Sequence, residues 1–391
     1  MATGDLDDKL VVLRGPRRPG KSVLVKDTAI ALCRRRSIDP RQIIYLAFDG
    51  MDSSDLRRAL HLGRELTRSM KDARRVWLLD EVTAITGWTK ELKYLRDNTP
   101  FGNDTVVCTG SSWDATSNVE RDLMAGRSGY RSEQRIRTLH PMSFREVIHA
   151  TNRDIPTFEM VKPWDLQSPT ALNIAESLEH FVNELDDAWQ SYLTSGGFPR
   201  AVAESYTTGF VSDSFLEDLS SWLFRDIDPD AGVGSVPRLL ASIESHSGSP
   251  LTRSKLVQEL NYSDKNTFEV RLNRLSHAYA AIWCHQVDSD GNRFRGSQSK
   301  FYLADPLLAW IGHRLTPGSP SPDFSRVPIQ SPDRIMMSDP IESKWVANAW
   351  QGEARVIENY FSGGIVATRS ITDTSKPSWA LPAPVVALLL E

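Results

Sequence analysis

The sequence predicts an α/β fold in which helices cover both faces of a parallel sheet. The apolar residues 10–13 precede a glycine-rich turn and then the helical apolar spacing of residues 23–36. Strand-like and helical segments continue to alternate as far as residue 112, which is the pattern of repeated βα units. The third strand-like segment ends in Asp80 and Glu81, at the edge where an open parallel sheet places its ligand. We therefore expect a ligand site at the carboxyl ends of these strands.

The turn after the first strand fits the phosphate-binding pattern G-x-x-x-x-G-K-[ST], since residues 15–22 read Gly-Pro-Arg-Arg-Pro-Gly-Lys-Ser. Its glycines let successive backbone N–H groups face an anion, and the following helix adds its N-terminal dipole. We expect Lys21 to reach the β- and γ-phosphates of ATP and Ser22 to hold Mg²⁺. The expected nucleotide-binding residues here are Gly15, Pro16, Arg17, Arg18, Pro19, Gly20, Lys21, Ser22 and Val23.

The acidic pair supplies the second half of a nucleotide-hydrolysing site. A strand over residues 42–48 and a helix capped by Ser53 or Ser54 lead to a strand that ends in this pair. Asp80 is expected to bind Mg²⁺ through water, and Glu81 to orient or deprotonate the attacking water. The next strand, residues 105–112, ends in small hydroxylated residues. These either bond the γ-phosphate or the attacking water, or simply cap the following turn.

Composition narrows the class of protein. The 391 residues suffice for two or three domains, and a net charge of −4 shows no overall basic excess for nucleic acid. Three widely spaced cysteines have neither zinc-ligand nor disulfide spacing. The acidic N-terminal residues do not resemble a signal peptide, and the longest apolar run, residues 380–390, is too short to cross a bilayer. We expect a cytoplasmic protein without membrane contact.

Taken together, the motifs resemble those of prokaryotic AAA+-type P-loop ATPases of the archaeal-ATPase and STAND-like kind. The resemblance covers about residues 10–306 and also rests on Leu-His-Pro-Met-Ser-Phe-Arg-Glu at 139–146 and Tyr-Leu-Thr-Ser-Gly-Gly-Phe-Pro at 192–199. It implies a P-loop NTPase core, a helical lid and a C-terminal winged helix. Pro19 departs from the family pattern, which more often has a small apolar residue before the second glycine.

The resemblance also implies roles for three further residues. Ser111 corresponds to the sensor position at the end of the fourth core strand, and Pro199 to the residue near the adenine. Arg127 is the candidate for an arginine that acts on the γ-phosphate of a neighbouring subunit, because a glycine precedes it in an arginine-rich segment. Surface solvation is the alternative role for any single arginine of this segment.

The second half of the chain predicts helices followed by a helix-turn-helix and a hairpin. Helical patterns at 171–192 and 212–224 form the expected lid. Helices at 255–260 and 266–275 and strands at 282–287 and 300–303 match a winged helix. Residues 251–300 carry eight Lys and Arg against five Asp and Glu, a mild basic excess. The charge permits duplex DNA binding through this module, and a protein contact or self-association remains the alternative.

The sequence therefore predicts four parts: an AAA+-type ATPase core at 1–150, a helical lid at 151–234, a winged helix at 235–312, and a linker with a helical tail at 313–391. One or two amphipathic helices are expected over residues 341–360. The leading function is a Mg²⁺-dependent ATPase that hydrolyses ATP to ADP and phosphate and acts as a nucleotide-dependent switch on DNA or protein. The alternative is a DNA- or protein-binding regulator in which ATP is a structural ligand with little turnover.

Overall fold

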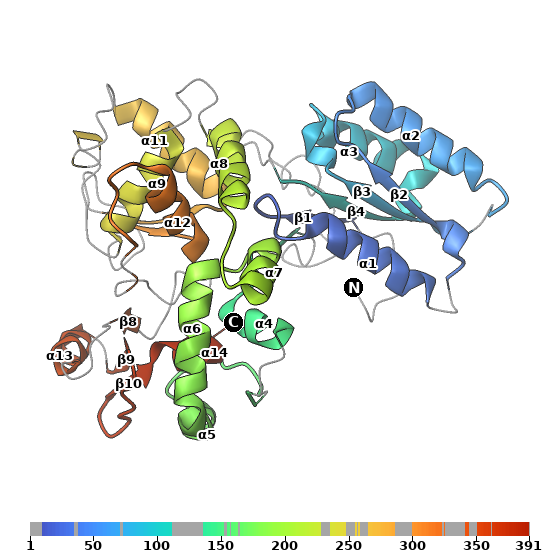
Figure 1. Cartoon of the computed structure of the whole chain (residues 1–391). Coiled ribbons are helices and arrows are strands. Elements are labelled where there is room, and N and C mark those ends of the chain that lie inside the picture. Colours follow the sequence, from blue (N-terminus) through green and yellow to red (C-terminus); the bar gives the residue numbers. More distant parts are fainter. Residues whose placement is uncertain are drawn as a thin grey trace. The chain divides into compact units, whose positions relative to one another are not determined.

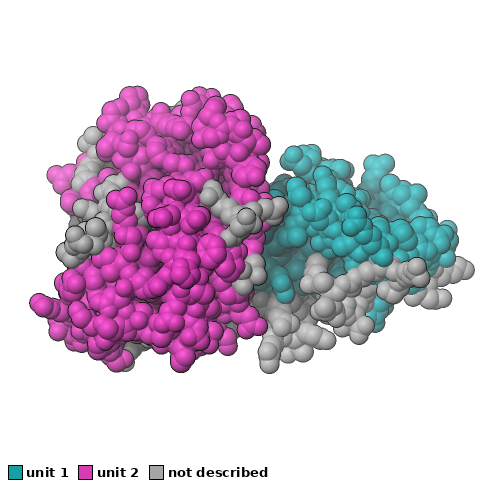
Figure 2. All heavy atoms as spheres, turned by 60° about the horizontal axis from the view of Figure 1, so that its bottom comes forward, with its two compact units in different colours: residues 1–140 teal, residues 141–391 magenta. Residues whose placement is uncertain are grey.

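The computed structural model describes most of the chain. The described residues are 10–34, 38–70, 73–111, 136–151, 155–156, 158–162, 165–227, 235–247, 255, 257–258, 265–285, 299–322, 324, 341–343, 350–360 and 362–390. The chain divides into two compact units, Met1–His140 and Pro141–Glu391 (Figure 2). Each unit has its own sheet and its own buried core, so we describe them separately.

The first unit is built on a five-stranded sheet with the order β2-β3-β4-β1-β5 (Figure 1). All neighbouring strands of this sheet are parallel, which confirms the expected fold class. The elements are β1 (Leu10–Arg14), α1 (Lys21–Cys33), β2 (Ile43–Ala47), α2 (Ser53–Leu66), β3 (Val76–Asp80), α3 (Trp88–Asn98), β4 (Thr105–Thr109) and β5 (Ile136–Thr138). Because the strands are parallel, the phosphate-binding loop (P-loop, residues 15–22) after β1 and the acids Asp80 and Glu81 at the end of β3 lie at the same edge of the sheet.

Helices cover both faces of this sheet. Val25 of α1 packs in one buried cluster with Leu78, whereas Leu56 of α2 and Leu92 of α3 pack in another cluster with Trp77. Since side chains alternate between the faces of a strand, Leu78 lies on the α1 face and Trp77 on the opposite face. All five residues of β3 are buried, as are those of β4. A strand covered on both sides reads as an apolar run, which is why the sequence pattern revealed β3 and β4 clearly.

The start of α2 differs from the prediction. The side chain of Asp52 caps this helix by accepting hydrogen bonds from the amides of Ser54 and Asp55, while the Asp55 carboxylate accepts from the Asp52 amide. The expected cap at Ser53 or Ser54 was therefore wrong. A carboxylate that completes a reciprocal capping box one residue earlier satisfies more of the exposed helix N–H groups than a single serine does.

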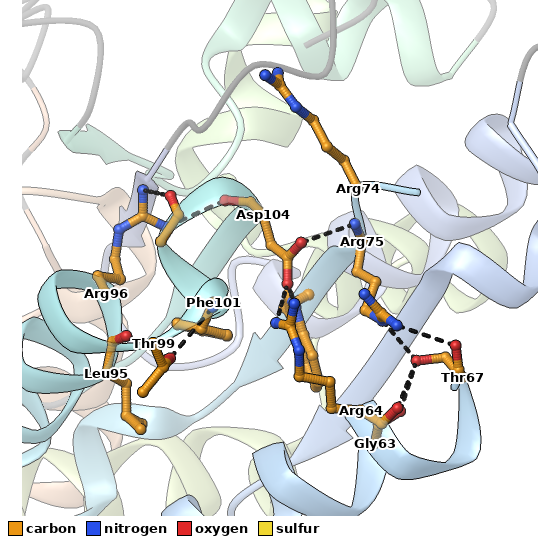
Figure 3. Close-up of polar contacts among 12 residues, drawn as sticks. Gly63, Arg64, Thr67, Arg74, Arg75, Leu95, Arg96, Thr99, Phe101 and Asp104 are labelled. Atoms are coloured by element: carbon orange, nitrogen blue, oxygen red, sulfur yellow. Dashed lines mark hydrogen bonds and ion pairs between the residues drawn. The ribbon is translucent and has the colours of Figure 1, made fainter. Parts of the chain in front are cut away.

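Buried charges hold the amino ends of β3 and β4 together (Figure 3). Asp104 accepts hydrogen bonds from Arg64 Nη1 and Trp77 Nε1, each at 2.9 Å, and from the Arg75 amide at 3.1 Å. The Arg75 guanidinium donates to the hydroxyl and carbonyl oxygens of Thr67. Burial, and next the nearby charge of Arg64, lower the pKa of Arg75. This cluster lies at the end of the strands opposite the P-loop, so its role is structural.

The second unit contains two large hydrophobic cores. Its helices before the hairpin are α4 (Phe144–Ala150), α5 (Pro169–Leu178), α6 (Val182–Ser195), α7 (Pro199–Thr208), α8 (Asp213–Ile227), α9 (Ser235–Ser245) and α11 (Lys265–His277). An antiparallel hairpin, β6 (Ala281–His285) and β7 (Ser299–Leu303), is followed by α12 (Pro306–Leu315). Helices α8, α9, α11 and α12 are labelled in Figure 1. Their buried side chains share one core with those of the hairpin. The other core joins α4, α5 and α6 to the last 30 residues of the chain.

The tail is an α/β unit and not only helical. It comprises β8 (Ile341–Ser343), α13 (Gln351–Tyr360), β9 (Gly364–Thr368), β10 (Ser378–Pro382) and α14 (Ala383–Leu389), and its parallel strands have the order β10-β9-β8. The expectation of one or two helices over residues 341–360 was therefore wrong in part. Leu178 of α5 and Leu185 of α6 belong to the same buried cluster as Ile365 of β9 and Val386 of α14. Contacts between residues far apart in the chain produce no periodic apolar pattern in so short a strand, so the sequence alone does not reveal such a strand.

Candidate functional site: a P-loop facing two acids

The P-loop, residues 15–22, begins at a glycine that has no room for a side chain. Gly15 has φ +148°, and a Cβ atom built on it would lie 2.1 Å from the carbonyl oxygen of Leu139. The Leu139 amide donates a 2.7 Å hydrogen bond to the Arg14 carbonyl, which extends the pairing of β1 with β5. The loop therefore leaves β1 in close backbone contact with the segment after β5.

The loop ends in left-handed backbone at the start of α1. Arg18 has φ +64° and Gly20 has φ +104°, and Gly20 is the N-cap of the helix without a side-chain cap. A helix that begins without a side-chain cap leaves N–H groups available to an anion. In the loop Pro16 and Pro19 are buried, Arg17, Arg18, Gly20 and Ser22 are partly buried, and Val23 at the start of α1 is exposed.

Lys21 folds back onto the loop that it follows. Its side chain is only 4% exposed, and Nζ donates to the carbonyl oxygens of Gly15, at 3.1 Å, and of Pro16. The ammonium group is thus held inside the curve of the loop, among backbone groups that a phosphate contacts in sites of this type. The sequence pattern predicted the lysine but not this inward position.

Asp80 ends β3 with both carboxylate oxygens engaged. Oδ2 accepts from the Tyr45 hydroxyl at 2.8 Å, and Oδ1 accepts from the Thr109 hydroxyl at 2.5 Å. Burial first, and then the hydrogen bond to Asp80, raise the pKa of Tyr45 to about 12. Neither Tyr45 nor Thr109 was among the expected site residues. Tyr45 looks like any other apolar residue of its strand in the sequence, whereas Thr109 belongs to the hydroxylated strand end that the sequence did mark.

Glu81 has left-handed backbone, with φ 55° and ψ 32°. Its amide donates to the Thr109 hydroxyl oxygen at 3.0 Å. Its carboxylate accepts from the Ser111 hydroxyl at 3.0 Å and from the Ser111 amide at 3.3 Å. The structure therefore brings Ser111 to Glu81, and Thr109 contacts both acids. A non-glycine residue in this conformation is uncommon, and residues with strained backbone cluster at active sites and ligand-binding segments.

The donor set at this edge suits a hard divalent cation. The Ser22 hydroxyl and the Asp80 carboxylate offer oxygen ligands of the kind that Mg²⁺ prefers, and such sites complete the coordination shell with water and phosphate oxygens. Across the described ranges, no group of three or more His, Cys, Asp or Glu side chains is suited to hold a metal by itself. The fit is thus to a cation that a bound phosphate helps to hold.

Two expected site residues are not placed with the others. Pro199 is the first residue of α7, after Phe198 as N-cap, and belongs to the second unit. Arg127 lies outside the described residues. Arg145, which lies just beyond the arginine-rich segment of residues 121–137, packs over the ring of Phe158 and donates to the carbonyl oxygens of Phe158 and Leu388. These contacts give Arg145 a structural role within the second unit.

The glycine pair before Pro199 is held by a buried carboxylate. Asp305 accepts from the Gly197 amide and from the Leu307 amide at the start of α12, each at 2.8 Å. A Cβ atom on Gly197 would lie 1.9 Å from the Met142 carbonyl oxygen, so the backbones touch here. Burial raises the pKa of Asp305 to about 6, against the lowering effect of both amides. This segment therefore ties α6, α7 and α12 together within the second unit.

Three side chains of the predicted helix-turn-helix that could contact duplex DNA, Arg271, Asn273 and Arg274, lie on α11. Arg271 is half-buried, Asn273 and Arg274 are exposed, and Arg274 Nη1 donates to the Ile227 carbonyl at the end of α8. The wing arginines, Arg293 and Arg295, lie outside the described residues. Nowhere in the described ranges does a helix have both the length and the apolar content of a bilayer-spanning segment.

Comparisons with known proteins agree with the fold of the first unit. Residues 7–148 match the family model of an AAA domain, and residues 186–313 match that of a domain of unknown function, DUF8612. No curated protein matches the sequence.

Several solved structures are similar over much of the chain. A Walker-type ATPase of Pyrococcus abyssi, paby2304, shares 14% identity over 78% of this chain and 90% of that chain, with a TM-score of 0.38. The ORC2 protein of Aeropyrum pernix, solved with ADPNP and ADP, shares 13% identity over 78% and 87%, with a TM-score of 0.35. A clamp-loader delta protein of Bacillus subtilis shares 8% identity over 68% and 83%, with a TM-score of 0.26. These likenesses are too distant to carry an argument about function. The family match and the sheet with its P-loop agree with one another: residues 7–148 match the AAA domain family and have the fold of P-loop NTPases.

Proposed function

We propose that the first unit binds ATP with Mg²⁺ and hydrolyses it to ADP and phosphate. One observation carries the proposal: the P-loop with Lys21 and the acids Asp80 and Glu81 emerge at the same edge of one parallel sheet. In this assignment Lys21 and the loop amides bind the phosphates, and Ser22 and Asp80 hold the hydrated cation. Glu81 then orients or deprotonates the attacking water. The Mg²⁺ ion supplies charge stabilisation for the transferred phosphoryl group.

Three further residues have roles in this proposal. Ser111, through its contact with Glu81, acts as the sensor residue that links the end of β4 to the water-activating carboxylate. Arg127 acts on the γ-phosphate of a neighbouring subunit. Pro199 contacts the adenine from the lid. ATP and Mg²⁺ are the ligands that this arrangement suits.

The rest of the chain would convert the nucleotide state into an output. In this proposal residues 1–150 form the ATPase core, 151–234 the helical lid, 235–312 a winged helix and 313–391 the tail. The succession α9, α11 and hairpin β6–β7 supports the winged helix, because a helix packed before a two-stranded wing is its ordinary order. Duplex DNA is the proposed partner, and a protein partner or self-association is the outcome if DNA does not bind.

The test of the catalytic proposal separates binding from turnover. Lys21→Ala is expected to abolish ATP binding in calorimetry, because the charge at the β- and γ-phosphates is lost. Glu81→Gln keeps the shape and the hydrogen bonds but not the base, so ATP binds and turnover falls about 10²–10⁴-fold. Lys90→Ala, an exposed lysine on α3, is the matched control and is expected to change neither quantity. Unchanged ATP affinity in Lys21→Ala, or unchanged turnover in Glu81→Gln, rejects the assignment of that residue.

The DNA proposal is tested by fluorescence anisotropy with a labelled duplex at low and moderate salt. Contacts with phosphates weaken steeply as salt rises, and Arg271→Ala is expected to lower affinity on all sequences alike. Arg274→Ala is a less clean probe, since the loss of its bond to Ile227 also removes a contact between α11 and α8. No binding at low salt, with or without ATP, leaves this module as a protein contact.

A further inference from the structure

The Asp80 carboxylate receives two side-chain hydroxyl donors, one from each strand beside β3. We propose that Tyr45 and Thr109 are positioning residues, which fix the Asp80 carboxylate in the orientation that receives the hydrated cation of the Mg²⁺–nucleotide complex. The inference rests on the proposed ATP site and adds two residues to it. Tyr45 comes from β2 and Thr109 from β4, so the carboxylate is held from both sides of its strand.

The register of the sheet explains how Tyr45 reaches Asp80. Ala47 of β2 lies opposite Asp80 in the parallel pairing, and Tyr45 lies two residues earlier on the same face. This is the face that α1 covers, and Lys26 of α1 lies 5.7 Å from the centre of the Tyr45 ring. The ring is therefore fixed between the helix that follows the P-loop and the strand that ends in Asp80. Its hydroxyl ends 2.8 Å from Oδ2.

Thr109 joins the two acids in one hydrogen-bonded chain. Its side chain is fully buried, its hydroxyl donates to Asp80 Oδ1, and its oxygen accepts from the Glu81 amide. A hydroxyl has one hydrogen to donate and two lone pairs to accept with. The hydrogen is directed at Asp80, so the orientation of the carboxylate and the backbone position of Glu81 are set by the same atom.

With the hydroxyls of Tyr45 and Thr109 bound, the Asp80 carboxylate can still accept hydrogen bonds from a hydrated cation. An ionised carboxylate has about four acceptor positions, and the two hydroxyls occupy one on each oxygen. The remaining positions are available to the water molecules around Mg²⁺. Groups that bond the outer side of a metal ligand fix its direction, and their removal commonly costs about 10–100-fold in metal affinity. A ring that merely filled space would not direct its hydroxyl to the carboxylate.

The experiment compares nucleotide binding with and without the cation. ADP binding is measured by calorimetry in EDTA and over a Mg²⁺ titration for the parent, Tyr45→Phe and Thr109→Val. In EDTA the affinity of both variants is expected to stay within about twofold of the parent, because the P-loop is untouched. The Mg²⁺ concentration that gives half of the affinity gain is expected to rise about 10–100-fold. The Mg²⁺ dependence of ATP turnover is expected to shift in parallel.

Controls separate the positioning role from packing. Tyr94→Phe removes the hydroxyl of an exposed tyrosine on α3 and is expected to leave the Mg²⁺ titration unchanged. Thr109→Ser keeps the donor and is expected to restore the titration that Thr109→Val loses. If Thr109→Val does not fold, which its melting curve shows, Tyr45→Phe alone decides the question.

The outcomes distinguish this inference from the function on which it rests. A parent protein that binds no nucleotide overturns the proposed ATP site and, with it, the inference. A parent that binds ADP while Tyr45→Phe titrates with Mg²⁺ as the parent does overturns only the positioning role. An equal loss of affinity in EDTA and in Mg²⁺ also overturns it, since the hydroxyl would then serve the loop and not the cation ligand.

Discussion

The hydroxyl of Ser111 donates a 3.0 Å hydrogen bond to Oε2 of Glu81, and the Ser111 amide approaches the same oxygen at 3.3 Å. The carboxylate after β3 is thus held by the residue just beyond the end of β4. The Glu81 backbone adopts a left-handed conformation at the same place. One oxygen of the proposed base accepts both hydrogen bonds from Ser111, and this contact sets the direction of the Glu81 carboxylate.

The first prediction concerns this contact. Ser111→Ala removes the hydroxyl donor and leaves the amide, and a hydrogen bond to a charged group contributes about 1.5–3 kcal/mol. If the contact orients Glu81 in the transition state, kcat for ATP hydrolysis is expected to fall about 10–100-fold, with ADP affinity within twofold of the parent. Steady-state turnover and calorimetry measure the two quantities. A variant that hydrolyses ATP faster than the parent would show instead that Ser111 restrains the base.

A second prediction addresses the start of the P-loop. Gly15→Ala places a methyl group where the Leu139 carbonyl oxygen lies and imposes a φ of +148° on an alanine. The loop must move, so ATP binding is expected to fall at least tenfold and the melting temperature to drop. Gly352→Ala is the matched control, because a Cβ atom there meets nothing within 4 Å. Its expected effect on either quantity is small. Parent-like binding and melting in Gly15→Ala would contradict the close backbone contact.

The third prediction concerns the buried cluster at the other end of the strands. Asp104→Asn keeps the size of the side chain but turns one acceptor into a donor, so at least one of the three N–H groups around it loses its partner. The free energy of unfolding is expected to fall by about 2–4 kcal/mol in urea denaturation. Asp27→Asn, at an exposed position of α1, serves as the control and is expected to change little. Equal stability of both variants would show that the cluster contributes nothing net.

The fourth prediction is a pH dependence of the second unit. The pKa of Asp305 is raised to about 6 in the folded protein from an ordinary value of 3.8, so the folded state binds the proton more tightly. The stability from this group is therefore fully present below pH 4 and is lost as the pH rises through 6. Tyr192 and Glu146 are the ionisable groups that share this charged environment.

Asp305→Asn removes the titrating group. The free energy of unfolding of the parent minus that of the variant is therefore expected to fall by up to about 3 kcal/mol between pH 4 and pH 7. Urea denaturation of both proteins at several pH values measures this difference. Asp187→Asn, an exposed site on α6, is the control for general effects of pH. A difference that stays constant from pH 4 to pH 7 would show that Asp305 remains charged throughout.

The sequence predicted the core of the site because its signals are local. The spacing of Gly15, Gly20 and Lys21, and two acids directly after a buried strand, are readable without knowing what packs against them. Tyr45 could not be found in this way, since its role depends on the pairing of β2 with β3 and on the side chain of Asp80. A tyrosine hydroxyl in an apolar strand can have many different partners, and only the three-dimensional structure shows which one it has.

Elsewhere the limits of the sequence have a similar cause. Strand β8 has three residues and β9 has five, which is too short for a periodic pattern to tell a strand from a turn or a helix end. Their parallel pairing joins segments on either side of α13, so no hairpin signal marks them. The cap of α2 depended on a choice among Asp52, Ser53 and Ser54, all of which are good capping residues.

Strands β3 and β4 carry a fixed polar contact at each end, because Asp104 receives Arg75 and Trp77 at one end and Thr109 receives Glu81 at the other. Each strand is only five residues long. A slip of one residue in their pairing would turn every side chain to the opposite face, and both end contacts would break together. The polar cluster around Asp104, far from the P-loop, therefore fixes the pairing register of β3 and β4. It fixes the position of Asp80 along β3 relative to Thr109 on β4, so a substitution at Asp104 that shifts the pairing also changes the geometry of the acids at the other end of the strands.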